Sequence, residues 1–185
     1  MVLTSSTPAI DEPRVWIGCL QCYNAGRLVG DWYSCTEAAD ITTSQLHARP
    51  IPEHTHEELW CLDTDNIPVN GEMSPMEAGE WGEVYEELDS PDLWPALCAW
   101  VRSGSYTAQG DTDLPVVSDF VDALAGTWSS FTAYVEELVE ETGMLDGVPD
   151  ELRGYFAIDR YARDLQGDYT VEPAPSGEVF VFRSL

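Results

Sequence analysis

The amino-acid sequence predicts an α+β protein of one to three small units, and three patterns support this prediction. Segments rich in Val, Trp, Ile, Leu and Tyr near the start of the chain are typical of strands. Helix-period segments with acidic outer faces fill the middle, and a second pair of strand-like segments closes the chain. We expect a flexible leader (1–13), a sheet-plus-helix domain (14–75), an acidic helical domain (76–117) and a C-terminal domain of helices plus antiparallel sheet (118–185).

The first domain should contain an antiparallel sheet and one helix. Arg14–Leu20 and Arg27–Ser34 are the expected hairpin strands, joined around Asn24-Ala25-Gly26. Thr36–Ala48 is the expected helix, which ends before a proline, and Glu58–Asp63 is the third strand.

The middle of the chain has well-marked helix starts. Ser74-Pro75-Met76-Glu77 combines an N-cap serine, a proline at the first helical position and a glutamate three residues after the cap. This helix should run to Leu88, and a second should run from Ser90 to Gly104. A third, shorter helix is expected over Val116–Ala125. The apolar stripe of the first helix consists of Trp81, Val84, Tyr85 and Leu88.

The C-terminal domain should begin with a helix capped by Ser129 or Ser130 and ended by Gly143. A short helix should open at Val148-Pro149, and Ile158–Leu165 should form another. Two strands, Asp168–Val171 and Glu178–Phe182, should form a closing hairpin. The inward face of the first helix consists of Phe131, Tyr134, Val135 and Leu138.

Charge is the most unusual property of the sequence. It holds 34 acidic residues and eight arginines without any lysine, for a net charge of −26. Residues 50–152 contain 24 of the acids and a single base, Arg102. Such an imbalance costs self-repulsion and disfavours nucleic acid and anionic membranes as partners, whereas a basic surface is the natural complement. The total equals the charge of about 13 base pairs, or about 44 Å, of duplex DNA.

An enzyme or metalloprotein is less well supported. No nucleophile elbow, zinc-protease helix motif or phosphate-binding glycine loop is present. Cys19-x-x-Cys22 has zinc-ligand spacing, but no second such pair follows, and His54-x-His56 lies in a proline-rich loop. We therefore expect free thiols, no metal centre and no cofactor. Without a signal-like or membrane-spanning segment, a cytoplasmic location is expected.

Three blocks of the sequence resemble the ArdA antirestriction proteins. The first block, Val15–Trp32, reads VWIGCLQCYNAGRLVGDW, and the second, Tyr134–Gly143, reads YVEELVEETG. The third, Val148–Leu165, reads VPDELRGYFAIDRYARDL. The resemblance implies an elongated protein of three domains in a row that imitates bent B-form DNA and blocks Type I restriction–modification enzymes. It also implies a head-to-head homodimer through the C-terminal domain, and no metal ligands at Cys19 and Cys22.

Two residue sets follow from the charge pattern together with this resemblance. The acidic surface expected to imitate DNA consists of Glu77, Glu80, Glu83, Glu86, Glu87, Asp89, Asp92, Asp111, Asp113, Glu136, Glu137, Glu140, Glu141, Asp150 and Glu151. The expected dimer contact consists of Met144, Leu145, Val148, Pro149, Leu152, Tyr155 and Phe156.

Other interpretations of the acidic helices stay open at this point. An acidic stripe on one helix is usually a solvated face, and the proteome of a salt-loving host has a similar composition. The chain could also be an acidic binding module for another basic DNA-binding protein.

Overall fold

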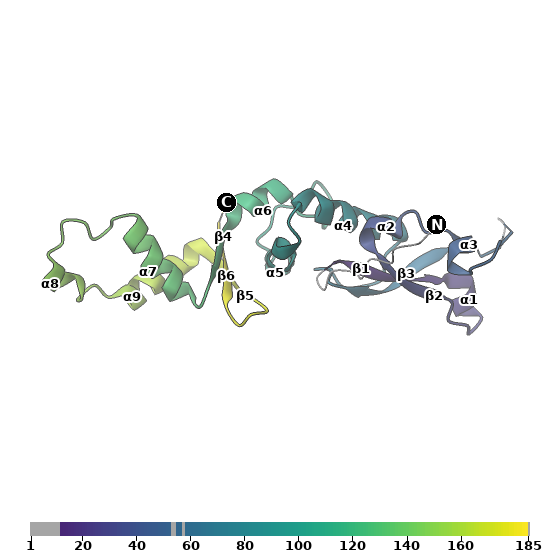
Figure 1. The fold of residues 1–185 in the computed structure, drawn as a ribbon, viewed down its shortest axis with the longest axis horizontal. Coiled ribbons are helices and arrows are strands. Elements are labelled where there is room, and N and C mark those ends of the chain that lie inside the picture. Colours follow the sequence, from purple (N-terminus) through teal and green to yellow (C-terminus); the bar gives the residue numbers. More distant parts are fainter. Residues whose placement is uncertain (1–11, 53–54, 57, 185) are drawn as a thin grey trace, which may run out of the picture. The chain divides into compact units, whose positions relative to one another are not determined.

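The computed structural model describes residues 12–52, 55–56 and 58–184. Most of the predicted leader lies outside these residues. Within the described part the chain is α+β, with two three-stranded antiparallel sheets and nine α-helices (Figure 1). The backbone contacts divide it into two compact units, Met1–Cys98 with Ala108–Val117, and Ala99–Thr107 with Ser118–Leu185. The predicted division into three domains stays a prediction.

The sheet of the N-terminal unit has the strand order β2-β1-β3. Its strands are β1 (Arg14–Cys19), β2 (Gly30–Ser34) and β3 (Leu59–Asp65), which confirms the three predicted strands. Val15 and Ile17 of β1 are fully buried on one face, as the alternation of side chains along a strand requires.

Trp16 lies on the other face of the same sheet and explains two glycines of the first sequence block. A Cβ atom on Gly18 would meet the Trp16 ring at 2.5 Å, and one on Gly30 would also collide with it. The indole therefore lies across both positions, where only glycine leaves room for it.

The predicted helix Thr36–Ala48 is wrong, because the structure has two short helices there. They are α2 (Cys35–Ala38) and α3 (Thr43–Leu46). Thr42 is extended and forms a reciprocal capping box with Gln45, so the local hydrogen bonds start a new helix at this point. A further short helix, α1 (Leu20–Asn24), lies in the connection between the first two strands.

Helix α4 (Pro75–Leu88) begins as predicted. The Ser74 hydroxyl accepts from the Glu77 backbone N–H at 3.2 Å, and the Glu77 carboxylate accepts from the Ser74 N–H at 2.7 Å. Gly82 faces α2 so closely that a Cβ atom there would lie 2.5 Å from the Cys35 carbonyl carbon. Three residues of the predicted stripe, Trp81, Val84 and Leu88, are buried.

The helix predicted from Ser90 begins instead with a 3₁₀ turn, η1 (Pro91–Leu93), followed by α5 (Trp94–Ser103). Helix α6 (Val117–Ala123) is shorter than predicted, because the chain enters strand β4 (Leu124–Trp128), which the sequence did not indicate. Pairing with β6, rather than any local pattern, makes this segment a strand.

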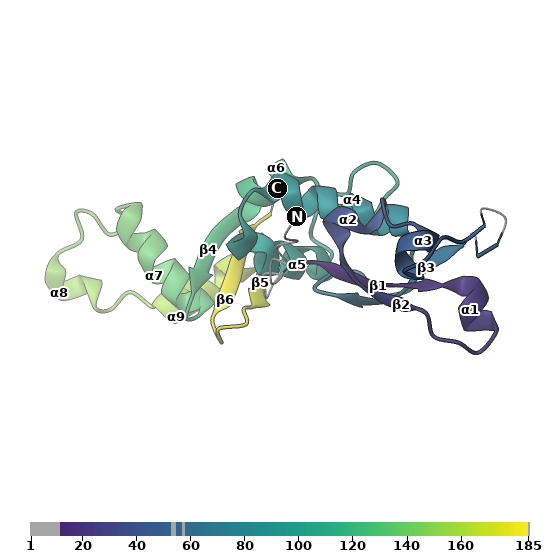
Figure 2. The same cartoon turned by 45° about the vertical axis from the view of Figure 1, so that its right-hand side comes forward.

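The C-terminal unit packs its helices against a sheet of order β4-β6-β5. The predicted hairpin is confirmed as β5 (Tyr169–Pro173) and β6 (Val179–Arg183). Helices α7 (Phe131–Glu141) and α9 (Ile158–Leu165) lie side by side, with the one-turn α8 (Asp150–Arg153) at the tip away from the sheet (Figure 2). A 3₁₀ turn, η2 (Gln166–Asp168), leads from α9 into β5.

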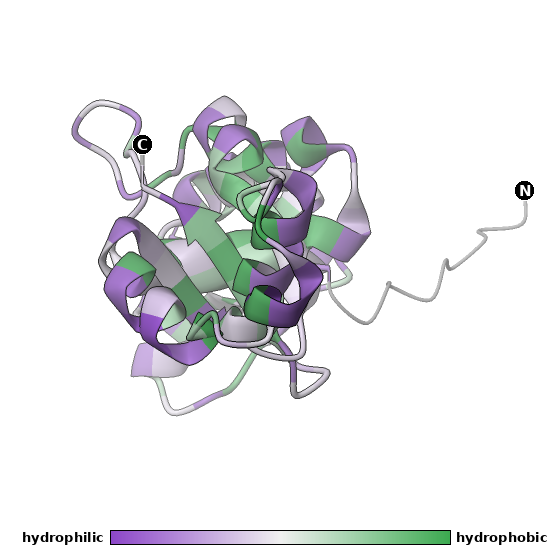
Figure 3. Cartoon of the chain, turned by 90° about the vertical axis from the view of Figure 1, so that its left-hand side faces the viewer, coloured by the Kyte–Doolittle hydropathy of each residue, from purple (hydrophilic) through white to green (hydrophobic). Residues whose placement is uncertain are grey.

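The core of this helical region is formed by one face of α7, one face of α9 and β6. Its buried residues are Tyr134, Val135, Val139, Ala162 and Val181. Colouring by hydropathy shows both hydrophilic and hydrophobic residues on the helices nearest the viewer, as expected for amphipathic helices (Figure 3). Among the described residues, no helix has both the length and the apolarity needed to cross a membrane.

Candidate functional site

Every residue of the predicted acidic surface is exposed. Most of the fifteen side chains project from α4 and α7, and the others lie in loops, in η1 or on α8. Charged side chains are absent from the buried residues of the described chain. Exposure by itself is ordinary for carboxylates, so the charges around them decide whether this surface is unusual.

These carboxylates have almost no cationic partners. Within the described ranges, the ion pairs are Arg14 with Asp65 at 2.6 Å and Arg153 with Asp150 at 3.5 Å. Asp150 is thus the one member of the predicted surface with an ion-pair partner there, and its side chain is 97% exposed. A pair so open to water contributes little. The surface therefore keeps nearly all of its negative charge.

Two other members have a structural role in the fold. Glu77 closes the capping box of α4, and its hydrogen bonds from the backbone and hydroxyl of Ser74 lower the pKa of its carboxyl group. Glu137 accepts a hydrogen bond from the Trp128 indole N–H at 2.8 Å. Because the remaining acids lack such contacts among the described residues, they are free to bind an external partner.

Helix α4 holds its charges at a density close to that of a DNA strand. Five glutamates lie between Glu77 and Glu87, and ten residues of α-helix span about 15 Å. Their mean axial spacing is therefore about 3.7 Å, compared with 3.4 Å between phosphates along one strand of B-DNA. The helical backbone fixes this axial spacing, but the helical twist spreads the carboxylates around the exposed side of α4.

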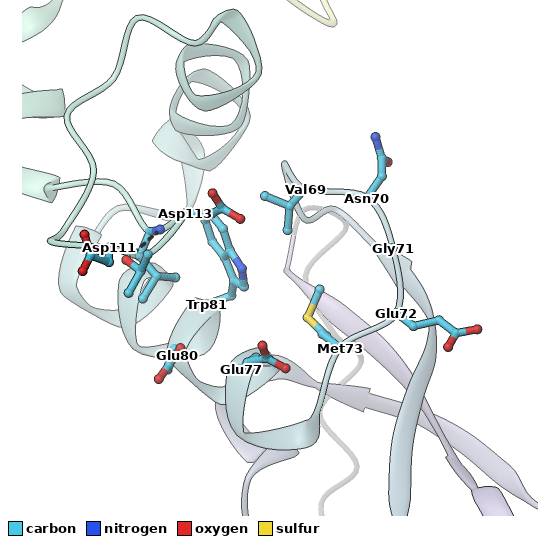
Figure 4. A pocket seen from close by; sticks show the side chains of 12 residues that line it. Val69, Asn70, Gly71, Glu72, Met73, Glu77, Glu80, Trp81, Asp111 and Asp113 are labelled. Carbon is cyan, nitrogen blue, oxygen red and sulfur yellow. Dashed lines mark hydrogen bonds between the residues drawn. The ribbon is translucent and has the colours of Figure 1, made fainter.

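The structure brings two separated parts of the predicted surface together at one hollow (Figure 4). Glu77 and Glu80 of α4 line a space of about 350 Å³ with Asp111 and Asp113 of a later loop. Glu72, which the sequence analysis did not select, lines the same space. A carboxylate-lined hollow of this kind suits a guanidinium or ammonium group, which can donate several charge-assisted hydrogen bonds to the carboxylates.

The acids of α7 form a separate group in the C-terminal unit. Glu136, Glu137, Glu140 and Glu141 are exposed, whereas Tyr134, Val135 and Val139 are buried on the opposite face. Glu140 and Glu141 lie in the last turn, where the helix dipole disfavours negative charge. Like charges four residues apart also repel. Fold stability alone therefore does not account for Glu136, Glu140 and Glu141.

The predicted dimer segment divides into outward and inward side chains. Met144, Leu152 and Tyr155 are 44%, 54% and 85% exposed, so apolar surface faces solvent around α8. Leu145 and Phe156 instead pack against the core of the unit. Val148 is half-buried, and Pro149 is exposed at the N-cap of α8.

A cluster that the sequence analysis did not assemble lies at one end of the N-terminal sheet. Cys19 ends β1, Cys22 lies in α1, His47 follows α3 and His56 precedes β3. One potential ligand atom from each side chain lies within 4.8 Å of all the others. His54 lies outside the described residues.

This cluster could not be predicted from the sequence, because zinc motifs are recognised there by a second closely spaced ligand pair, which the chain lacks. His47 and His56 are far from the cysteines in the chain, and only the fold brings them together. Burial raises the pKa of the Cys19 thiol. Burial, together with the charges of His56, Arg49 and Arg27, lowers the pKa of His47 and favours its neutral imidazole, the form that ligates metals.

Fold and surface together define a class of small α+β proteins with a one-signed, exposed acidic surface. The family model described as "Antirestriction protein (ArdA)" matches residues 15–180. The chain therefore belongs to the ArdA antirestriction protein family, as the three sequence blocks suggested, and membership implies an antirestriction function directed at restriction–modification enzymes. A search among curated proteins found no match.

Proposed function

We propose that this protein imitates B-form DNA and competitively occupies the DNA-binding groove of Type I restriction–modification enzymes. The observation that carries the proposal is the set of fifteen exposed carboxylates with a single weak ion pair among the described residues. Family membership supplies the class of target. The mechanism needs no bond making or breaking, so neither an enzymatic reaction nor a cofactor is part of it.

The physical basis is competition for the same cations. A DNA-binding groove holds phosphates with Lys and Arg side chains, and these contacts supply most of its sequence-independent affinity. The charge intervals along α4 and the acidic hollow beside it offer carboxylates to the same side chains. Since many weak contacts share the binding, loss of one carboxylate should matter little, and rising salt should weaken binding steeply.

A homodimer through the segment around α8 is part of the proposal. The exposed apolar side chains of Met144, Leu152 and Tyr155 supply contact area that a monomer would leave in water. Two copies joined there would double the charge presented to one enzyme complex.

The test is inhibition of a purified Type I enzyme in competition with duplex DNA, followed across salt concentration. The test variant replaces four glutamates of α4 by glutamine and leaves the capping residue Glu77 intact. A matched control variant removes the same number of charges from exposed acids outside the predicted surface. The test positions are Glu80, Glu83, Glu86 and Glu87, and the control positions are Asp159, Asp164, Asp168 and Glu178.

The proposal expects purely competitive inhibition with a steep salt dependence. The test variant should inhibit much more weakly than the control variant, although both keep the helical circular dichroism of the parent. A folded test variant that inhibits at full strength would refute the mimicry mechanism. Inhibition that DNA does not relieve would refute competition for the groove. A pull-down against basic DNA-binding proteins tests the alternative of a general acidic binding module. Capture of a different protein in place of the restriction complex would favour that alternative.

A further inference from the structure

We propose that Cys19, Cys22, His47 and His56 bind a structural zinc ion in the N-terminal unit. This inference does not depend on the proposed function. It concerns a part of the chain that the acidic surface does not use.

The positions of the ligand atoms fit a tetrahedral zinc centre. The Cys19 and Cys22 sulfurs lie 3.2 and 3.4 Å from Nδ1 of His56, and the four ligand atoms lie within 4.8 Å of one another. Zinc bonds of about 2.3 Å to sulfur and about 2.0–2.1 Å to nitrogen place the corners of a tetrahedron about 3.3–3.8 Å apart. An ion therefore needs only shifts of side chains within about an ångström.

His47 supplies a second, independent observation. Its Nε2 atom is buried and makes no hydrogen bond, the one such side-chain atom in the described part of the chain. The ring lies 4.8 Å from that of His56, nearly perpendicular to it at 72°. A buried polar atom without a partner costs about 1–3 kcal/mol, so its occurrence beside two thiols and another imidazole needs an explanation. A bond to a metal ion would supply the missing partner.

His56 is held in place by hydrogen bonds to α1, which carries Cys22, and to α3, which His47 follows. Its backbone N–H donates to the Gln21 side chain at 2.8 Å, and its carbonyl accepts from the Thr43 hydroxyl at 3.1 Å. Its φ of +58° lies in the left-handed region, which few residues other than glycine adopt. Outer contacts that fix the orientation of a ligand are typical of metal sites.

The donor set selects zinc among the common metal ions. Two sulfurs and two imidazoles arranged tetrahedrally suit zinc, whereas calcium and magnesium require oxygen ligands. Four protein ligands leave no position open for substrate, which is typical of a structural site rather than a catalytic one. On binding, the ion replaces the two thiol protons. The loaded centre, Zn²⁺ with two thiolates and two neutral imidazoles, then has the same net charge as the empty one.

The expected role is to hold together three short segments. Helices α1 and α3 have five and four residues, far below the length at which an isolated helix is stable. One ion would connect β1 and α1 to the end of α3 and to the loop before β3. Because such a site is absent from the unfolded chain, the energy of metal binding becomes folding energy.

The test is the metal content of the untagged full-length protein, purified with reductant and without chelator. Mass spectrometry should find one zinc ion per chain. Cobalt exchanged into the site should give the visible absorption of a tetrahedral thiolate complex. This measurement uses the parent protein and needs no variant. Cys22→Ala and His47→Ala should lose both signals. Cys35→Ala, which removes a buried thiol of the same unit outside the cluster, should keep them.

Thermal unfolding gives a further readout. A chelator should lower the Tm of the parent protein and leave that of His47→Ala unchanged. The proposal is overturned if the reduced parent takes up neither zinc nor cobalt, if the cobalt complex is not tetrahedral, or if the two site variants retain stoichiometric zinc. Equal loss of zinc from the Cys35→Ala control would also overturn it, because the metal would then not be specific to these four residues.

Discussion

Neutralising three glutamates of α7 should stabilise the protein and weaken its function at the same time. The variant is Glu136→Gln, Glu140→Gln and Glu141→Gln, which retains Glu137 because that residue accepts the hydrogen bond from Trp128. Opposite changes in stability and inhibition are the expected result where charge serves a partner rather than the fold. If the glutamates instead made contacts needed for folding, their loss would lower both stability and inhibition.

The size of the stability change follows from the positions of the charges in the helix. The substitutions remove two like-charge pairs four residues apart, each worth about 0.2–0.5 kcal/mol. They also remove two anions from the last turn, each unfavourable by about 0.3–1 kcal/mol at low salt. Because all three side chains are exposed and screened, the net gain should be about 1 kcal/mol, or about 2–4 °C in Tm for a chain of this length.

The assays are thermal unfolding and restriction inhibition, each at low and high salt. The gain in Tm should shrink as salt rises, because screening weakens the repulsion that the variant removes. Inhibition should weaken most at low salt. A lower Tm at low salt would refute the reasoning about stability, and unchanged inhibition would remove α7 from the binding surface.

Three further predictions concern the fold and the proposed dimer. Ser74→Ala should cost about 0.5–2 kcal/mol, because it removes the oxygen that accepts from the Glu77 N–H. The lowered pKa of Glu77 stabilises the fold above its ordinary pKa, and that contribution is lost as pH falls through the folded pKa; the substitution should reduce it in part, because it removes the hydroxyl contact and keeps the larger one from the backbone N–H of residue 74. Chemical unfolding from pH 7 to pH 3 measures both effects. Gly82→Ala should lower the unfolding free energy by about 1–2 kcal/mol, although alanine has the better helix propensity, because the new Cβ meets the backbone of α2. The control Gly167→Ala, which has open space around it, should change the unfolding free energy by less than about 0.5 kcal/mol. Tyr155→Ser should leave Tm nearly unchanged and shift sedimentation towards the monomer; a variant that stays as dimeric as the parent would contradict the proposed contact.

Features set by nearby residues could be predicted from the sequence. Helix α4 starts after Ser74 and helix α7 after Ser130, as predicted. In both, the serine side chain accepts a hydrogen bond from the backbone N–H three residues later, so the start depends on local sequence alone. Helix α9 has the predicted bounds, because its apolar period and its flanking residues agree. Exposure of the acids was equally predictable, since an unpaired buried carboxylate is costly.

Features that depend on distant residues could not be predicted in the same way. Strand β4 exists because it pairs with β6, and its sequence, LAGTW, has no clear alternation. The approach of Asp111 to Glu77, and of His47 to Cys19, depends on how the chain returns to the same place. Spacing along the sequence does not show which distant segments come into contact in the fold.

The separation of charge from core in this protein has an evolutionary consequence. The buried residues are apolar and the exposed acids make few internal contacts, so one set can change without disturbing the other. Under the proposed function, an enzyme could escape inhibition only by altering the cations with which it holds DNA, and so at a cost to its own activity. The inhibitor, in contrast, could exchange its acids one at a time. In such a contest the protein that imitates the substrate has more freedom to vary than the enzyme that must still bind it.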